Sequence, residues 1–387
     1  MRLILLTPAE AGAGVCLDGS PPALYYVAAK AAAHNASWVV MLQGGGWCVD
    51  EASCAERSRT SLGSTAQLAA KQRSLRVGGI LHGLALRNPD FHAFHRVLLH
   101  YCDGGSFTGD RDVGALHLRG RAVLDAQLRR LEAMGLSDAE RVLFGGFSAG
   151  GLGAAVHADA VRARLRRVRQ FGVLAASGFF WPGAGADAPS SRWSNGPFLQ
   201  RLYDFHRSGG SLHPNCLMQQ PAEGMWRCLY ASEAIAAARA PIFVAHSALD
   251  TWQLVNVWGE NRACAASCFS RCDADEVRRL NRILGTFVDG VRRAVLARAG
   301  NGAFVTSCPQ HSGAQKLGFS KWAIGGVPLR LALRRWWEAP PDAPAEAHAH
   351  LPCALRDAPA NGSHNCEPSC AKVCKAERPT FGFELPS

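Results

Sequence analysis

The stretch Gly145-Gly146-Phe147-Ser148-Ala149-Gly150-Gly151 decides the fold of this 387-residue chain. It contains Gly-x-Ser-x-Gly, follows an apolar run at 141–144 and precedes a helical pattern that extends through 154–168. This context is typical of a nucleophile elbow, in which glycines flank a serine at a tight strand-to-helix turn. A Walker-type phosphate loop is disfavoured because no Gly-Lys-Ser/Thr follows. We therefore expect Ser148 to be an exposed nucleophile at a helix N-terminus, whose dipole favours developing negative charge.

Short apolar runs on either side of this turn predict a central, mostly parallel sheet. They are continuous rather than alternating, as expected when helices cover both faces. From Asp273, apolar residues recur at helical spacing as far as Val295, and Gly300 follows as a stop. Strands that alternate with helices predict an α/β fold. The predicted strands are residues 38–42, 96–100, 141–144, 171–174, 241–245 and 303–306.

A serine nucleophile needs a base and an acid that orients the base, and after an elbow the chain order is Ser, Asp or Glu, then His. Asp250 follows the strand at 241–245, and His311 follows the strand at 303–306. His246 precedes Asp250 and breaks this order, so we interpret it as a hydrogen-bonded core or loop histidine. Asp103 and Asp110 are excluded as the acid because they precede the serine. The expected triad is Ser148, Asp250 and His311.

The segment Gln43-Gly44-Gly45-Gly46-Trp47-Cys48 comes directly after the strand at 38–42. Consecutive glycines let backbone amides approach an oxyanion without a Cβ in the way. We expect the amides of Gly46 and Trp47, with that of Ala149, to form the oxyanion hole. Together these elements predict acyl transfer without a metal or organic cofactor.

Composition limits the remaining choices. Apolar residues make up 48% of the chain, enough for a large core, and no apolar run reaches the roughly 18 residues of a membrane span. The 42 Lys and Arg exceed the 31 Asp and Glu, a net charge of +11 that favours acidic partners. The basic residues are scattered, so we do not expect nucleic-acid binding.

Fourteen cysteines and the sequons at Asn35 and Asn361 favour secretion, although residues 1–6 are too short for a full signal peptide. We expect a leader that is missing or removed. Residues 1–338 are expected to form the catalytic domain, and 339–387 a Pro-rich linker with a Cys-rich tail. We interpret the tail, with Cys353, Cys366, Cys370 and Cys374, as a disulfide-stabilised segment packed against the main domain. A zinc site using its cysteines and His364 is the alternative, and it lacks the paired Cys-x-x-Cys spacing of a strong zinc signal.

These motifs resemble the pectin acetylesterase family, which includes the Notum carboxylesterases. The matching segments are residues 15–22, 43–48, 88–91, 101–110, 119–120, 147–151, 250–253 and 307–311. The resemblance covers roughly residues 3–338 and implies an α/β-hydrolase fold with the triad and oxyanion hole named above. It implies a secreted carboxylesterase acting on an acylated polysaccharide, with O-acetyl groups of pectin favoured. A Notum-like deacylase acting on a fatty acyl group of a protein, or a non-catalytic glycan-binding protein on this scaffold, are the alternatives.

The aromatic residues Phe179 and Phe180 follow the strand after the elbow helix, and with the Trp47 ring they are expected to line the acyl pocket or to pack in the core. Among the cysteines, Cys48 and Cys54 are expected to clip the oxyanion loop, and Cys16 with Cys102 to tie the N-terminal segment to the sheet edge. The remaining cysteines before the tail are given no connectivity. The sequence makes no prediction of the oligomeric state.

Overall fold

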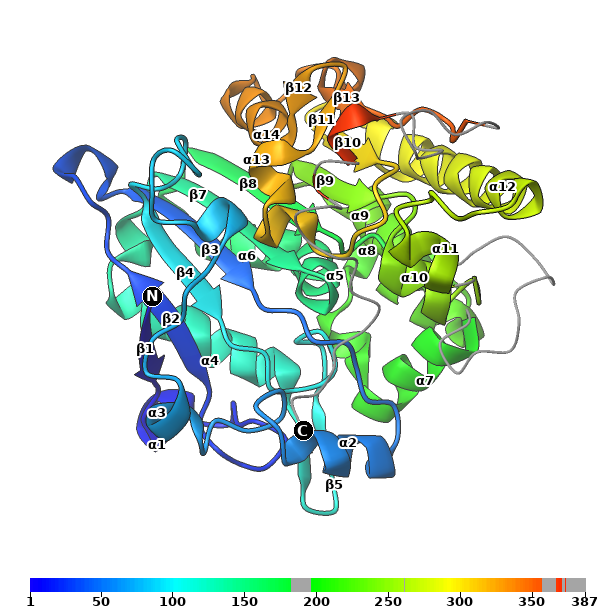
Figure 1. Ribbon diagram of the computed structural model, residues 1–387. Coiled ribbons are helices and arrows are strands. Elements are labelled where there is room, and N and C mark those ends of the chain that lie inside the picture. The colour runs from blue at the N-terminus through cyan, green and yellow to red at the C-terminus, as the bar shows by residue number, and fades with distance from the viewer. Residues whose placement is uncertain (182–195, 261, 357–366, 371–372, 374–387) are drawn as a thin grey trace.

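The central feature of the computed structural model is a nine-stranded sheet of order β1-β2-β4-β3-β7-β8-β9-β10-β13 (Figure 1). The structure describes residues 1–181, 196–260, 262–356, 367–370 and 373. Neighbouring strands from β4 to β13 pair in parallel, whereas β1 and β2 add an antiparallel edge. The strands are β1 Arg2–Leu5, β2 Ala23–Val27, β3 Ser37–Leu42, β4 His95–Leu99, β7 Arg141–Phe147, β8 Gln170–Ala176, β9 Ile242–Ser247, β10 Gly302–Thr306 and β13 Ala349–His350.

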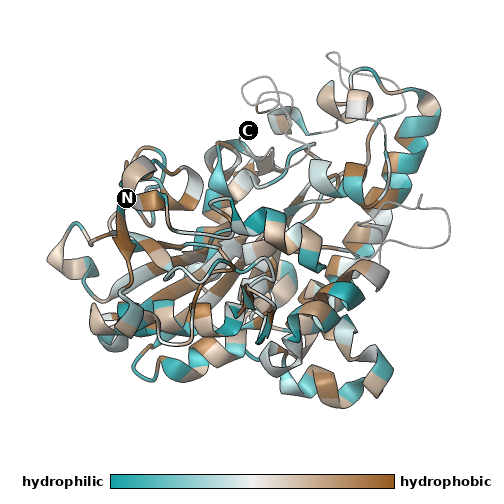
Figure 2. Ribbon diagram, turned by 90° about the horizontal axis from the view of Figure 1, so that it is seen from below, coloured by the Kyte–Doolittle hydropathy of each residue, from teal (hydrophilic) through white to brown (hydrophobic). Residues whose placement is uncertain are grey.

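Helices cover both faces of this sheet, which explains its continuous apolar strands. Val40 and Leu42 of β3 belong to one core cluster, and the alternating Val39 and Met41 to a second on the opposite face. The strands in the interior are accordingly mostly brown in Figure 2, and the outer helices carry the teal polar residues. The helices are α1 Pro8–Ala11, α2 Glu51–Ser58, α3 Leu68–Lys71, α4 Gly120–Ala133, α5 Ala149–Val156, α6 Ala158–Arg164, α7 Gly196–His206, α8 Pro214–Gln219, α9 Ala231–Ala237, α10 Thr251–Asn256, α11 Arg262–Ala266, α12 Ala274–Val291, α13 Gly318–Lys321 and α14 Leu329–Glu338.

The predicted α/β fold is confirmed, and each expected strand lies in the sheet as β3, β4, β7, β8, β9 or β10. The helix expected from Asp273 is α12, which begins with a capping box between Asp273 and Glu276. The prediction of one helical stretch after the elbow differs from the structure in one respect, because two helices, α5 and α6, meet there at His157. Two short two-stranded sheets, β5 Arg111–Val113 with β6 Leu116–Leu118 and β11 Ala323–Ile324 with β12 Val327–Pro328, lie outside the main sheet.

The segment after α14 returns to the sheet. Ala349 and His350 of β13 pair in parallel with Ala303 and Phe304 of β10. A disulfide between Cys308 and Cys370 then fixes the tail beside the end of β10. Among the described residues, no helix is both long and apolar enough to span a bilayer.

Candidate active site

Ser148 lies in a strained turn between β7 and α5. Its φ of 55° and ψ of −124° are unusual for a residue with a side chain. A Cβ at Gly146 would lie 2.0 Å from the Gly150 carbonyl oxygen, and one at Gly150 would lie 2.4 Å from the Leu42 oxygen. Only glycine therefore fits on either side of the serine, which is the physical basis of the Gly-x-Ser-x-Gly pattern.

His311 joins Ser148 to Asp250. Its Nε2 atom lies 2.8 Å from Ser148 Oγ, and its Nδ1 atom lies 2.7 Å from Asp250 Oδ2. Because the carboxylate only accepts, Nδ1 carries the hydrogen of the neutral ring and Nε2 accepts the serine hydroxyl. Three side chains separated by up to 163 residues thus form one continuous hydrogen-bonded chain.

Asp250 is held as a carboxylate. It is fully buried at the N-terminus of α10, where Oδ1 accepts hydrogen bonds from the backbone amides of Trp252 and Gln253 at 2.9 and 3.1 Å. Burial by itself raises the pKa of Asp250, but the charge and hydrogen bond of His311 and the Gln253 amide outweigh it, so the pKa is lowered. The acid is therefore ionised wherever His311 works as a base.

The glycine turn after β3 lies against the elbow. A Cβ on Gly44 would be 2.2 Å from the Phe147 carbonyl oxygen and 2.8 Å from Ser148 Cβ, so the turn contacts the nucleophile directly. Gly46 has a φ of 64°, in the left-handed region. The structure therefore brings the turn that carries Gly46 and Trp47 to the same place as Ala149, the first residue of α5. Their role as oxyanion donors remains a prediction.

The rings of Trp47, Phe180 and Trp252 pack together beside the triad. Trp47 lies 4.9 Å from Phe180 and 5.7 Å from Trp252, and Phe180 lies 5.4 Å from Trp252, measured between ring centroids. Phe180 and Trp252 each approach the His311 ring at 6.5 Å. These three rings, each less than a tenth exposed, form an aromatic cluster that borders the reacting groups.

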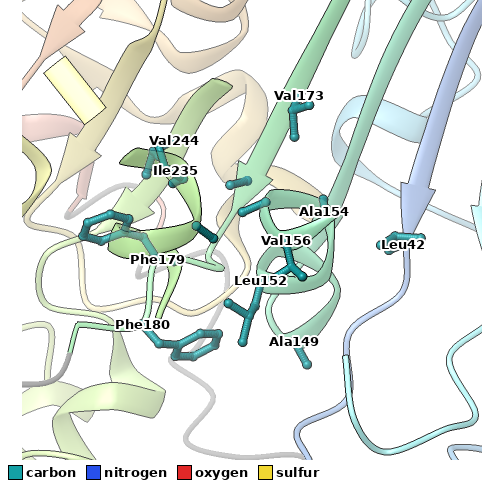
Figure 3. Close-up of a cluster of buried hydrophobic side chains, with 14 of the residues drawn as sticks. Leu42, Ala149, Leu152, Ala154, Val156, Val173, Phe179, Phe180, Ile235 and Val244 are labelled. Atoms are coloured by element: carbon teal, nitrogen blue, oxygen red, sulfur yellow. The ribbon is translucent and has the colours of Figure 1, made fainter. Parts of the chain in front are cut away.

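Of the two interpretations of Phe179, pocket lining and core packing, its surroundings favour core packing. Its ring is fully buried and packs 5.5 Å from Phe287 of α12 and 6.1 Å from Trp181. Figure 3 shows that the rings of Phe179 and Phe180 point in different directions. The turn at Ser177, which has a φ of 49°, precedes both residues and ends the strand geometry. Both rings belong to the buried core cluster, and of the two only Phe180 has a described ring contact with His311, so its place in an acyl pocket remains a prediction.

The histidine that breaks the chain order lies directly behind the acid. His246 is fully buried, and its Nε2 lies 3.0 Å from the side-chain nitrogen (Nε2) of Gln253 and 3.6 Å from Asp250 Oδ2. Its Nδ1 accepts from the Phe179 amide at 3.2 Å. Burial lowers the pKa of His246 to about 4, so the ring stays neutral at physiological pH. This agrees with its interpretation as a hydrogen-bonded core histidine.

Sequence reasoning missed the partner that joins the glycine turn to the elbow helix. Ser106 Oγ accepts a hydrogen bond from the Trp47 indole at 2.7 Å and donates one to the Ala149 carbonyl at 2.7 Å. Ser106 and Phe107 both have positive φ, so the loop that carries them is tightly folded. The signal was the segment at 101–110, which carried the resemblance but no assigned role. Asp103 in this loop is fully buried and accepts from the Gly105 and Phe107 amides.

Cysteine pairing braces the loops around the site. Both expected disulfides, Cys16–Cys102 and Cys48–Cys54, are present. Further bridges join Cys216 to Cys228, Cys264 to Cys272 and Cys308 to Cys370. Within the described ranges, every cluster with metal-ligand chemistry contains two cysteines already bonded to each other, which cannot act as thiolate ligands. Asn361, His364, Cys366 and Cys374 lie outside the described residues, whereas Asn35 is exposed.

The chain is similar to several known proteins. A family model described as pectinacetylesterase matches residues 1–353. Pectin acetylesterase 7 of Arabidopsis thaliana is 32% identical over 321 residues, 79% of this chain and 78% of that protein. The palmitoleoyl-protein carboxylesterase NOTUM of Schmidtea mediterranea is 27% identical over 255 residues, 62% of this chain and 47% of that protein. A structure of the Wnt deacylase Notum from Drosophila has a TM-score of 0.74 at 22% identity and covers 96% of this chain and 98% of its own.

Proposed function

Because this chain belongs to the pectinacetylesterase family and is a carboxylic ester hydrolase, we propose that it uses Ser148, His311 and Asp250 to remove O-acetyl groups from pectin or a related acidic polysaccharide. One observation carries the catalytic assignment: His311 bridges Ser148 Oγ and Asp250 Oδ2 at 2.8 and 2.7 Å. These distances are hydrogen bonds already formed, so the hydroxyl is activated in the resting enzyme.

The reaction proceeds in two halves. Ser148 Oγ attacks the ester carbonyl while His311 Nε2 takes the hydroxyl proton, and Asp250 stabilises the imidazolium. The tetrahedral intermediate collapses as His311 returns the proton to the departing sugar hydroxyl, leaving an acetyl-serine. Water then attacks the acyl group, His311 takes one of its protons, and acetate leaves as the proton returns to Ser148.

The oxyanion of each tetrahedral intermediate is stabilised by the amides of Gly46, Trp47 and Ala149. The glycine turn lies against Ser148, and α5 begins at the next residue, so amide donors converge from two elements. Removing one such donor typically reduces the rate by about 10²–10³.

The aromatic cluster favours a short acyl group. Trp47, Phe180 and Trp252 are in mutual ring contact beside His311, and bulky rings at this position favour a small acyl group. The net charge of +11 favours attraction to a polyanion such as pectin. Removal of a fatty acyl group, as the name of the Notum relatives describes, is the second candidate.

Secretion is part of the same proposal. Five disulfides are described, and they persist in an oxidising compartment such as the cell exterior. The cell wall, where pectin lies, is the expected place of action.

The test measures acetate release from acetylated pectin, together with hydrolysis of p-nitrophenyl acetate and p-nitrophenyl octanoate. We expect the acetyl substrates to be hydrolysed, octanoate to be disfavoured, and Ser148→Ala to lose at least about 10³-fold in kcat. A fluorophosphonate probe should label the wild type and not Ser148→Ala. Full activity in Ser148→Ala refutes the assigned nucleophile, and a preference for octanoate favours the fatty-acyl candidate. A labelled site that releases no acetate from pectin refutes the substrate alone.

A further inference from the structure

Two buried side chains hold the carbonyl oxygens of the glycine turn by hydrogen bonds. Arg57 Nη1 donates to the Gly45 carbonyl oxygen at 2.9 Å, and the Tyr101 hydroxyl donates to the Gly46 carbonyl oxygen at 2.8 Å. Arg57 belongs to α2, and Tyr101 follows β4, so the two anchors come from different parts of the chain.

The carbonyls that they hold are those bonded to the proposed oxyanion donors. The Gly45 carbonyl shares a peptide unit with the Gly46 amide, and the Gly46 carbonyl shares one with the Trp47 amide. In a planar trans peptide the C=O and N–H bonds point in opposite directions. Fixing each oxygen therefore aims the corresponding N–H away from Arg57 and Tyr101.

The third proposed donor is anchored in the same manner. The Ala149 amide shares a peptide unit with the Ser148 carbonyl, which accepts from the Leu152 amide at 3.0 Å within α5. Thus every peptide unit assigned to the oxyanion hole has its oxygen held by a hydrogen bond. Preorganised dipoles of this kind need no reorientation when negative charge develops.

We propose that Arg57 and Tyr101 are positioning residues that orient and polarise the two peptide units of the glycine turn for oxyanion binding. This inference rests on the proposed esterase function and adds to it two residues that touch no substrate. A cation at the oxygen of a peptide draws electron density from its nitrogen and makes the N–H a stronger donor, because hydrogen bonds in a chain polarise one another.

The environment keeps both anchors in the required protonation state and place. Burial raises the pKa of the Tyr101 phenol, so it stays a donor, and the phenol oxygen also accepts from the Ser106 amide at 3.0 Å. Arg57 is 8% exposed, donates a second bond through Nε to the Leu62 carbonyl at 3.0 Å, and stacks over the Tyr101 ring at 5.1 Å. Burial lowers the pKa of the Arg57 guanidinium, and the nearby Tyr101 and Asp103 oppose this shift.

A disulfide and a helix cap also hold Arg57 close to the glycine turn. The Cys48–Cys54 disulfide links the residue after Trp47 to α2, the helix that carries Arg57. Asp50 caps that helix by accepting from the Ser53 amide at 2.8 Å. The turn and its cationic anchor are therefore parts of one small closed unit.

The decisive experiment compares Tyr101→Phe with Tyr25→Phe on p-nitrophenyl acetate. Tyr25 is a matched control because it is equally buried, lies on β2 and directs its hydroxyl to the Gln72 carbonyl, away from the turn. We expect Tyr101→Phe to lower kcat by about 10-fold to 10²-fold with KM within about 2-fold, less than the loss of a direct donor. Tyr25→Phe should keep kcat within about 2-fold. Thermal unfolding should show both variants folded.

A second pair and an inhibitor separate positioning from mere structural support. Arg57→Lys retains a cationic donor and should keep more activity than Arg57→Met, by about 10-fold. Affinity for a trifluoromethyl ketone, which forms a tetrahedral oxyanion with Ser148, should fall with kcat/KM across all variants. Equal kcat in Tyr101→Phe and Tyr25→Phe, or equal activity in the two Arg57 variants, overturns the inference while the wild type remains an esterase. Should Tyr101→Phe fail to fold, the Arg57 pair decides. An inactive wild type instead overturns the proposed function and this inference with it.

Discussion

The replacement Phe180→Ala should lengthen the acyl chain that the enzyme accepts. Phe180 is the member of the aromatic cluster that contacts both Trp47 and Trp252 and also faces His311. Its replacement by alanine removes the six ring carbon atoms from the edge of the site while leaving the triad and the glycine turn in place. The vacated volume is apolar and lies beside His311, between Trp47 and Trp252.

The size of the effect follows from the burial of methylene groups. Butyrate carries two more methylenes than acetate, and each contributes about 0.8 kcal/mol when buried. In the variant the two together favour butyrate by about 1.6 kcal/mol, which raises the butyrate-to-acetate ratio of kcat/KM by about 15-fold. The wild type cannot gain this energy because the ring occupies the space.

The assay measures kcat/KM for p-nitrophenyl acetate, butyrate, hexanoate and octanoate in wild type and variant. Phe179→Ala is the matched control, because it removes the same ring from the adjacent position but opens the core against Phe287. Both replacements should lose about 3–5 kcal/mol of stability, a value typical of Phe→Ala in a core. Only Phe180→Ala should change the chain-length profile.

Two results would refute this reasoning. A folded Phe180→Ala with the wild-type ratio would mean that the ring does not border the acyl group. An equal shift in Phe179→Ala would mean that general loosening, rather than local volume, controls chain length.

Three further predictions concern the triad, the pH range and the tail. Asp250→Asn should remain folded yet lose about 10⁴-fold in kcat, because an amide nitrogen in place of Oδ2 would favour the wrong tautomer of His311. Kinetic assays measure kcat and circular dichroism checks the fold; a retained kcat would contradict the prediction. The free energy of unfolding, measured with urea, should fall between about pH 6 and pH 4 by on the order of 4 kcal/mol per pH unit. On unfolding, four buried histidines take up protons, whereas Asp103, whose pKa burial raises to about 6, releases one. A flat profile would contradict this prediction. Burial lowers the pKa of each of these histidines to about 4, so their stabilisation is present above pH 6.5 and lost towards pH 4: His100, His157, His206 and His246. Replacing Cys308 and Cys370 by serine should reduce stability by about 4 kcal/mol, the value expected for the entropy of a closed loop with a separation of 62. Activity should also fall, because Cys308 lies three residues before His311. An unchanged melting temperature would refute a structural role for this disulfide.

Local patterns in the sequence were sufficient to predict the fold class and the three residues that the structure joins by hydrogen bonds, Ser148, His311 and Asp250. Continuous apolar runs predict strands buried on both faces, and the glycines around Ser148 reflect contacts within one turn, where any Cβ would collide with a carbonyl. Asp250 and His311 follow strands whose carboxyl ends meet at one edge of a parallel sheet, so their positions in the chain indicated their positions in space. The antiparallel edge of β1 and β2 and the two-residue β13 carried no comparable signal, because short strands show little periodicity.

Only the tertiary structure decided which side chains serve the site. Phe179 and Phe180 are indistinguishable by composition, and the backbone turn at Ser177 together with the packing of α12 sends one ring into the core and the other to the triad. Arg57 and Tyr101 reach the glycine turn from elements 12 and 55 residues away from the carbonyls that they hold. A sequence records the order of residues, whereas the direction of a peptide dipole depends on partners that only folding brings beside it.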